Sequence, residues 1–206
     1  MKLRVVARQQ QMVRCDFETW PAEEVLLKHL GAFGRLLDET DVLVLSDYGK
    51  GGLSHITKMI EAARARKIPI LVDPKGDDYA RYAGATVITP NRSELREVVG
   101  RWRDEADLTE RAQNLRTSLG LEHLLLTRSE EGMTLYSASG QITVPAQARE
   151  VFDVSGAGDT VIAVLAATLA TGVPIEEAVA VANKAGGIVV GKLGTATVSY
   201  DELFGN

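Results

Sequence analysis

The chain has 206 residues, of which 45% are hydrophobic, and it carries a formal net charge of −5 with a single cysteine, Cys15. This length allows one domain with a sizeable core, and the acidic balance argues against a nucleic-acid-binding surface. One cysteine excludes an intrachain disulfide and a cysteine-rich metal site, and the lack of a long apolar run predicts a soluble, cytoplasmic protein with no membrane span.

The chain begins with two expected strands, at residues 4–8 and 12–17, joined by a turn at Gln9–Gln11, with alternating arginines on one face. Short apolar runs then alternate with helical patterns, and a hairpin is expected over 133–144 around Ser139 and Gly140. The pattern predicts strands at 42–45, 69–72, 85–88 and 123–126, and helices at 22–37, 55–66, 93–99, 108–119, 158–170 and 175–190.

This alternation predicts an α/β fold with a doubly wound, mainly parallel sheet flanked by helices. Ligands of such folds bind at the carboxyl ends of the strands. Several polar residues stand just past a strand or at a helix start, and they are therefore candidate site residues: Asp47, Asp73, Asn91, Thr127 and Asp159.

A glycine-rich turn precedes the helix expected at 158–170. Gly156, Ala157 and Gly158 leave the backbone uncovered, so the first free N–H groups of the helix can point at an anion such as a phosphate. Asp159 lies in the first helical turn, where it is placed to accept a hydroxyl proton. The simpler alternative is that the glycines allow close packing and Asp159 only caps the helix.

The string Asp153-Val-Ser-Gly-Ala-Gly-Asp159-Thr resembles the C-terminal signature of the ribokinase-like, or PfkB, carbohydrate kinases. The resemblance covers nearly the whole chain and is closest to the heptose-phosphate kinases of that family. Its other motifs follow in the family's order: Ser46-Asp-Tyr-Gly-Lys-Gly51, Val72-Asp-Pro-Lys75, Thr89-Pro-Asn-Arg-Ser-Glu94, Leu126-Thr-Arg-Ser-Glu-Glu-Gly-Met133 and Gly191-Lys-Leu-Gly-Thr-Ala-Thr-Val-Ser199.

The resemblance implies an ATP- and Mg²⁺-dependent sugar kinase. Its substrate would be D-glycero-β-D-manno-heptose 7-phosphate, phosphorylated at the anomeric C1 hydroxyl to the 1,7-bisphosphate, in ADP-heptose and lipopolysaccharide core biosynthesis. The same resemblance implies that Asp159 is the general base and that Gly156, Ala157 and Gly158 hold the transferring phosphoryl group. Another PfkB-type sugar kinase and a non-catalytic nucleotide-binding fragment remain alternatives. A Rossmann dehydrogenase is the weakest alternative, since no Gly-x-Gly-x-x-Gly follows an early strand.

Family members organise Mg²⁺ and phosphate with an Asn-x-x-Glu motif, commonly through water, and Asn91 and Glu94 match it. Asn91 capping the helix, with Glu94 completing the cap, is an alternative that can hold at the same time. Thr127 and Gly132 match the loop that meets the ATP phosphates and ribose, for which an ordinary turn is the alternative.

Three residues near the C-terminus complete the expected nucleotide site. Asn183 matches a position that approaches the adenine, with a helix-surface amide as the alternative. Gly194 lets the chain turn back beneath the nucleotide, and Lys192 either touches a phosphate or is solvated.

The resemblance further implies a monovalent cation, K⁺, held by Asp153, the carbonyl of Ser155 and the backbone of residues 194–199, although a turn-stabilising aspartate is the alternative. The sugar phosphate requires basic residues distant from Asp159. The basic candidates are Arg4, Arg8, Arg14 and Lys50, of which Arg8 and Lys50 are preferred, and simple solvation of the charges is the alternative. Asp47, in the same loop as Lys50, is a further candidate for substrate binding.

The family's N-terminal sugar-binding segment has no counterpart in this sequence. Residues 1–17 are therefore expected to be lid-returning strands and 18–206 the nucleotide-binding core, together the C-terminal two-thirds of a kinase domain. No adenylyltransferase module follows. A sheet truncated in this way would expose an edge and an apolar face, which favours pairing with another chain, and a homodimer is expected.

Overall fold

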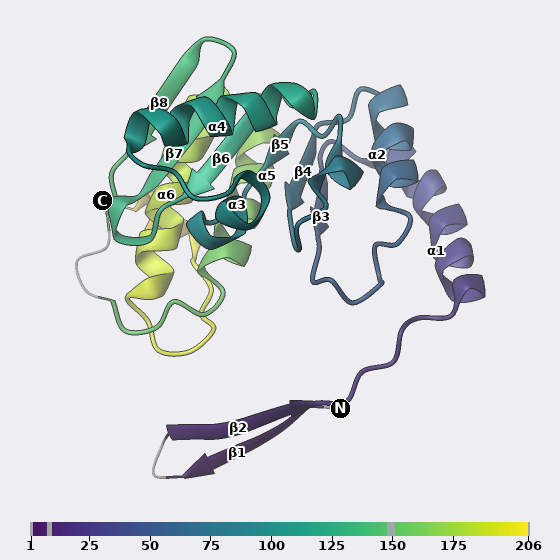
Figure 1. Cartoon of the computed structure of the whole chain (residues 1–206), viewed down its shortest axis with the longest axis horizontal. Helices are drawn as coiled ribbons and strands as arrows, with labels where there is room; N and C mark the ends of the chain where they lie inside the picture. The colour runs from purple at the N-terminus through teal and green to yellow at the C-terminus, as the bar shows by residue number, and fades with distance from the viewer. Residues whose placement is uncertain (1, 8–9, 148–150, 206) are drawn as a thin grey trace.

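A computed structural model describes residues 2–7, 10–147 and 151–205 of the chain. Figure 1 shows a layered body, in which helices cover both faces of a sheet, and a two-stranded hairpin that projects away from it. The body contains the two hydrophobic clusters of the core, one on each side of the sheet.

The central sheet has six described strands in the order of the chain. The first four strands pair parallel with one another, and the fifth pairs antiparallel with both the fourth and the sixth. This arrangement confirms the mainly parallel sheet and the hairpin expected at its end. The strand order leaves β3 at one edge, as expected for the exposed sheet edge. The strands are β3 (Leu43–Ser46), β4 (Ile70–Asp73), β5 (Val87–Ile88), β6 (His123–Thr127), β7 (Met133–Ser137) and β8 (Gly140–Val144).

Alternate side chains of each strand enter opposite clusters, because successive residues of a strand point to opposite faces. In β4, Ile70 and Val72 pack into one cluster and Leu71 into the other. On the first side lie α1 (Glu23–Leu36), α2 (Ile56–Ala65), α3 (Arg92–Val99) and α4 (Glu105–Ser118); on the second lie α5 (Ala157–Leu169) and α6 (Ile175–Val190).

Element boundaries differ from the prediction where polar caps decide them. Helix α4 begins at Glu105, earlier than expected, because the Asp104 side chain accepts a hydrogen bond from the Asp107 N–H. Strand β5 is shorter than predicted, since Thr86 uses its side-chain oxygen to accept from the Ile70 N–H. Four short helices were not predicted: η1 (Leu37–Glu39), η2 (Tyr79–Tyr82), η3 (Ser129–Glu131) and α7 (Tyr200–Phe204).

The N-terminal hairpin pairs β1 (Lys2–Ala7) with β2 (Gln10–Asp16) in an antiparallel ladder. Gln10 and Gln11 belong to β2, so the turn predicted at Gln9–Gln11 is wrong for these two residues, whereas Arg8 and Gln9 lie outside the described residues. Leu3 pairs with Cys15 and Val5 with Val13, and all four side chains are exposed, which gives the hairpin an apolar face. None of the helices in the described ranges has the length and apolar character needed to cross a membrane.

Candidate active site

A pocket of about 210 Å³ lies where β4, β5 and β6 end and α3 and α5 begin, and we call it the central pocket. It brings together seven residues that the sequence analysis selected, and it adds Thr89 and Val161; the seven are Asp73, Asn91, Glu94, Thr127, Gly156, Gly158 and Asp159. Residues from four loops therefore converge at the carboxyl edge of the parallel strands, as expected for this fold class.

The glycine-rich turn presents backbone donors to this pocket. Gly156 is the N-cap of α5 and has φ 79°, a left-handed conformation that glycine adopts without strain. The Ala157 N–H donates to the Val154 carbonyl, whereas the N–H groups of Gly158 and Asp159 have no hydrogen-bond partner among the described residues. Two free donors at the positive end of a helix form a site for an anion.

Asp159 stands exposed in the first turn of α5, beside those donors. Its Oδ1 accepts a hydrogen bond from the Oη of Tyr48 at 3.0 Å, although the two residues are 111 positions apart. The carboxylate is therefore both accessible and oriented. Sequence reasoning did not select Tyr48, and nothing in the local pattern links it to Asp159.

Asn91 and Glu94 form a complete capping box at the start of α3. The Asn91 Oδ1 accepts from the Ser93 and Glu94 N–H groups, at 2.9 and 3.0 Å, and the Glu94 Oε2 accepts from the Asn91 N–H at 3.0 Å. The capping alternative is thus confirmed, and the same residues also line the central pocket. The other Glu94 oxygen accepts from the ammonium of Lys75 at 3.0 Å.

Asp73, at the end of β4, is the residue of the central pocket whose pKa is shifted from its ordinary value. Burial, and then the negative charges of Glu94 and Asp159, raise its pKa to about 6. Its place directly after a buried strand was noticed in the sequence, but no role was assigned to it. A carboxyl with a raised pKa in a pocket is characteristic of functional sites.

The oxygen atoms that line the central pocket suit a cation that keeps its water ligands better than a cation bound directly by protein side chains. Asp73, Glu94 and Asp159 place three carboxylates in one pocket, and their mutual repulsion contributes to the raised pKa of Asp73. Within the part of the chain that the structure describes, no three acidic, histidine or cysteine side chains converge closely enough to ligate a metal directly. Mg²⁺ commonly binds through one or two carboxylates, waters and ligand phosphates, so the residues present fit that ion.

A second hollow of about 360 Å³ adjoins the first through Tyr48. It is lined by Ser46, Asp47, Tyr48, Lys50, Gly52 and Leu53. Two of the residues predicted to bind substrate, Asp47 and Lys50, thus lie in one hollow, while the third, Arg8, lies outside the described residues.

The side chains of Asp47 and Lys50 already have partners within the chain. The buried Asp47 carboxylate accepts from the Gly49 N–H and from the Tyr82 Oη, each at 2.8 Å, and therefore fixes the loop that carries Tyr48. The Lys50 ammonium pairs with Glu18. Direct contact of either residue with a substrate stays a prediction.

The remaining nucleotide candidates, Gly132, Asn183, Lys192 and Gly194, do not line the central pocket. Gly132 has φ 90°, and a Cβ atom there would lie 2.0 Å from the Val144 carbonyl oxygen, so the loop after β6 requires glycine. Asn183 is buried and donates to the Pro145 carbonyl at 2.8 Å, so the alternative of a helix-surface amide is wrong. Lys192 donates to the Thr197 carbonyl and pairs with Glu202, at 2.7 and 2.6 Å, and Gly194 has φ 70° in the same segment.

Asp153 closes a tight turn before the glycine-rich segment. Its Oδ1 accepts from the Ser155 N–H at 2.8 Å, and this bond, with a weaker one from the Gly194 backbone, lowers the pKa of the Asp153 carboxyl. The turn-stabilising alternative is therefore confirmed. The contact with Gly194 also brings together the two segments that were expected to hold K⁺.

Comparison with solved structures identifies the architecture. Phosphofructokinase-2 from Escherichia coli, in a crystal structure with potassium, superposes with a TM-score of 0.79 at 21% identity, covering 98% of this chain and 67% of that one. Ribokinase from Arabidopsis thaliana, complexed with ribose and ATP, gives a TM-score of 0.69 at 20% identity over 85% of this chain and 56% of that one. The fold is thus ribokinase-like.

Two curated relatives are much closer in sequence. The D-beta-D-heptose 7-phosphate kinase of Bordetella bronchiseptica is 54% identical over 205 residues, covering all of this chain and 66% of the relative. The bifunctional protein HldE of Methylococcus capsulatus is 54% identical over 203 residues, covering 98% of this chain and 43% of the relative. The chain therefore spans two thirds or less of the length of these relatives. Residues 4–202 match the family described as pfkB family carbohydrate kinase, and the chain belongs to that family.

Proposed function

We propose that the protein containing this chain transfers the γ-phosphoryl group of ATP to the anomeric hydroxyl of a heptose 7-phosphate, D-glycero-β-D-manno-heptose 7-phosphate, giving the 1,7-bisphosphate. The observation that carries the proposal is the juxtaposition of the unpartnered Gly158 and Asp159 N–H groups with the accessible Asp159 carboxylate. The similarity to the kinase of Bordetella bronchiseptica supports the choice of sugar.

In this proposal the two hollows divide the substrates. The central pocket takes the phosphates of ATP, and the hollow lined by Asp47 and Lys50 takes the sugar phosphate. Asp159 lies at their junction through its bond with Tyr48. There it accepts the proton of the attacking hydroxyl, while the Gly156 to Gly158 turn stabilises the charge that develops on the transferring phosphoryl group.

We further propose that Mg²⁺ is held by Asn91 and Glu94 through water, with Asp73 as an additional carboxylate of that site. When bound, the ion neutralises the phosphate oxygens and the surplus of carboxylates. Thr127 and Gly132 contact the phosphates and ribose, Asn183 approaches the adenine from α6, and Lys192 and Gly194 border the nucleotide. The hydrogen bond from Asn183 to the Pro145 carbonyl supports the placement of Asn183, since it fixes the segment that follows β8.

Four further assignments complete the proposal. K⁺ binds between Asp153, the Ser155 carbonyl and the Gly194 segment, which the contact between Asp153 and Gly194 supports. Residues 1–17 form part of a lid over the sugar, with Arg8 and Lys50 facing its phosphate, while residues 18–206 form the nucleotide-binding core. The exposed apolar face of the hairpin supports a homodimer, and the need for ATP supports a cytoplasmic reaction.

The test combines binding and turnover in one sample. Calorimetric titration with a non-hydrolysable ATP analogue and Mg²⁺ is followed by an assay of ADP release that depends on heptose 7-phosphate, with a panel of other sugars and sugar phosphates as controls. Binding together with heptose-dependent turnover supports the proposal, and preferred turnover of another sugar overturns the choice of substrate. Binding without turnover identifies a nucleotide-binding fragment, and absence of binding contradicts the role of the glycine-rich turn.

A further inference from the structure

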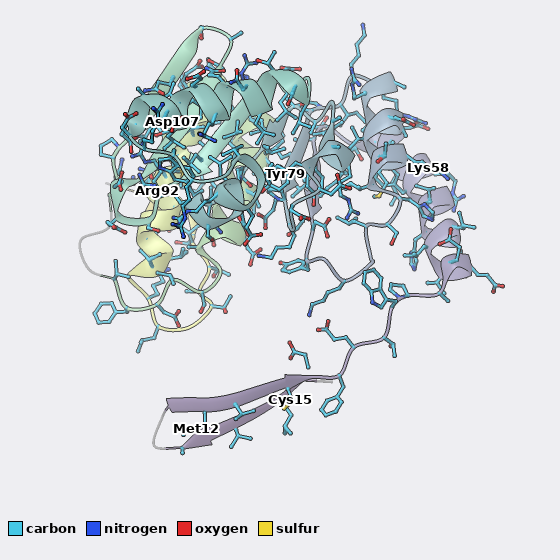
Figure 2. All side chains as sticks on the ribbon, in the orientation of Figure 1. Met12, Cys15, Lys58, Tyr79, Arg92 and Asp107 are labelled. Atoms are coloured by element: carbon cyan, nitrogen blue, oxygen red, sulfur yellow. The ribbon has the colours of Figure 1, made fainter. Side chains whose placement is uncertain are left out.

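A separate hollow of about 350 Å³ lies along α3, from its first residue to the segment that follows the helix, and we call it the arginine hollow. Its lining consists of Arg92, Arg96, Arg101 and Trp102. Figure 2 labels Arg92 on the α3 and α4 side of the molecule. None of the four residues lines the central pocket, although Asn91 and Glu94 on the same helix do.

The three arginines differ in how their charges are balanced. Arg92 pairs with Glu105 at 3.2 Å and also with Glu131, and both carboxylates are shared with Arg128. Arg96 and Arg101 have no ion-pair partner among the described residues. The guanidinium groups of Arg96 and Arg101, which have no ion pair among the described residues, therefore line a hollow together with the ion-paired Arg92.

Trp102 orients one of these groups. It packs against the hydrophobic core from the segment after α3, and the Arg96 guanidinium lies over its ring, 5.5 Å from the centroid. A cation held on an aromatic face loses less rotamer freedom when a ligand binds, which favours affinity. Arg101 lies beside Trp102 in the chain and completes the pair.

The neighbouring Arg103, in contrast, forms an ion pair with Asp107. Its Nε donates to Asp107 at 3.2 Å, and it does not line the hollow although it is highly exposed. Arg101 therefore lines the hollow without an ion pair, whereas Arg103, two residues further on, is paired and lies outside it.

Adjacent guanidinium groups bind phosphate oxygens in a bidentate manner and with strong charge-assisted hydrogen bonds. We propose that the arginine hollow binds the phosphoryl group of a small phosphorylated anion, held by Arg96 and Arg101, at a site distinct from the central pocket. The inference does not depend on which sugar the enzyme phosphorylates. Because Arg92 is adjacent to Asn91, a ligand in the hollow would contact the helix that carries the Asn91 and Glu94 capping box.

Heteronuclear NMR of the tryptophan indole groups tests the proposal. The chain has two tryptophans, and Trp20 lies elsewhere, against Gly51 beside the hollow that Lys50 and Gly52 line, so its signal reports binding at that hollow separately. Inorganic phosphate is titrated at constant ionic strength, with a non-hydrolysable ATP analogue and Mg²⁺ present so that the glycine-rich turn is occupied. The Trp102→Phe variant assigns the Trp102 signal.

We expect a saturable shift of the Trp102 signal with its own midpoint, independent of any shift of the Trp20 signal. Arg96→Gln combined with Arg101→Gln should weaken binding by at least about tenfold, since both charge-assisted hydrogen-bond donors are removed. The matched control Arg103→Gln should bind as the unmodified chain does, and circular dichroism verifies the fold of each variant.

Parallel titrations with glucose 6-phosphate and ADP separate the possible sources of the phosphoryl group. A stronger response to either than to inorganic phosphate supports the site and identifies an ester as its ligand. Absence of a saturable Trp102 shift with all three probes, or an equal shift in the folded double variant, overturns the proposal.

Discussion

Tyr48 donates a hydrogen bond to Asp159 from the opposite side of the active site, with 3.0 Å between Oη and Oδ1. The bond links the loop after β3, which the buried Asp47 holds in place, to the first turn of α5. The orientation of the proposed base therefore depends on a residue of the hollow that Asp47 and Lys50 also line. Tyr48 is a positioning residue, because it acts through Asp159.

Replacing Tyr48 with Phe tests this dependence. We expect kcat to fall roughly fivefold, or about 1 kcal/mol, which is less than the roughly 1.5–3 kcal/mol of a hydrogen bond to a charged group because Tyr48 is largely exposed. The Kd for the ATP analogue should stay unchanged, since Tyr48 does not line the central pocket. Steady-state kinetics with calorimetry measures both, and Tyr200→Phe, at another exposed tyrosine, is the control. A loss confined to ATP affinity would contradict the positioning role.

Asp159→Asn should abolish most of the turnover while preserving nucleotide binding. A general base contributes about 10²–10⁴-fold, so we expect kcat to fall by that factor. The backbone donors of Gly158 and Asp159 remain, so the Kd for the ATP analogue should change little. ADP release and calorimetry provide the two measurements, with Asp201→Asn on α7 as the control. Turnover equal to that of the unmodified protein would refute the base assignment.

The raised pKa of Asp73 makes its carboxyl a cost to the fold at neutral pH. Its pKa is about 6 in the folded chain and 3.8 in the reference state, so the folded chain binds the proton more tightly. The contribution of Asp73 to stability is therefore most favourable below pH 3.8 and is lost as the pH rises through about 6.

Asp73→Asn should then stabilise the chain at pH 8 by about 1–2 kcal/mol, a value discounted for partial exposure, and the gain should shrink as the pH falls toward 4. Urea unfolding at several pH values, in the absence of divalent cations, measures the effect. Asp78→Asn, at an exposed aspartate nearby, serves as the control. A pH-independent difference between Asp73→Asn and the unmodified chain would show that Asp73 does not titrate in this way.

Gly132→Ala should destabilise the loop between β6 and β7. The residue has φ 90°, and an added Cβ would lie 2.0 Å from the Val144 carbonyl oxygen, so backbone must move. We expect a loss of about 2–4 kcal/mol in the free energy of unfolding. Gly52→Ala, where a Cβ meets no atom within 4 Å, should have little effect, and chemical denaturation compares the two. Equal stability of the two variants would show that the loop adjusts freely.

Sequence periodicity was sufficient to predict the strands and the long helices, because burial on both faces of the sheet leaves short apolar runs such as 69–72. The glycine-rich turn and the Asn91 and Glu94 pair were predictable for a related reason, since each is a local pattern at the start of a helix. Local patterns also predicted the cap at Asn91, and the structure has the cap and the pocket together.

Contacts between distant residues could not be predicted in this way. The bond from Tyr48 to Asp159 and the burial of Asp47 against Tyr82 depend on how loops 111 and 35 positions apart meet. Lys192 illustrates the opposite case, since its motif suggested a phosphate whereas its ammonium pairs with Glu202. Polar side chains take whichever partner the tertiary fold brings near, and that partner is not encoded in the neighbouring sequence.

The central pocket draws its lining from segments that begin at Asp73 and end at Val161. The pocket forms only once β4, β5, β6 and the start of α5 have assembled, and such non-local parallel pairing is slow to form. A nucleotide bound in this pocket, as we propose, would recognise only the assembled sheet, and its binding free energy would be added to the stability of that sheet as a whole. In a cell, the abundance of the folded protein would then rise with the supply of its own nucleotide.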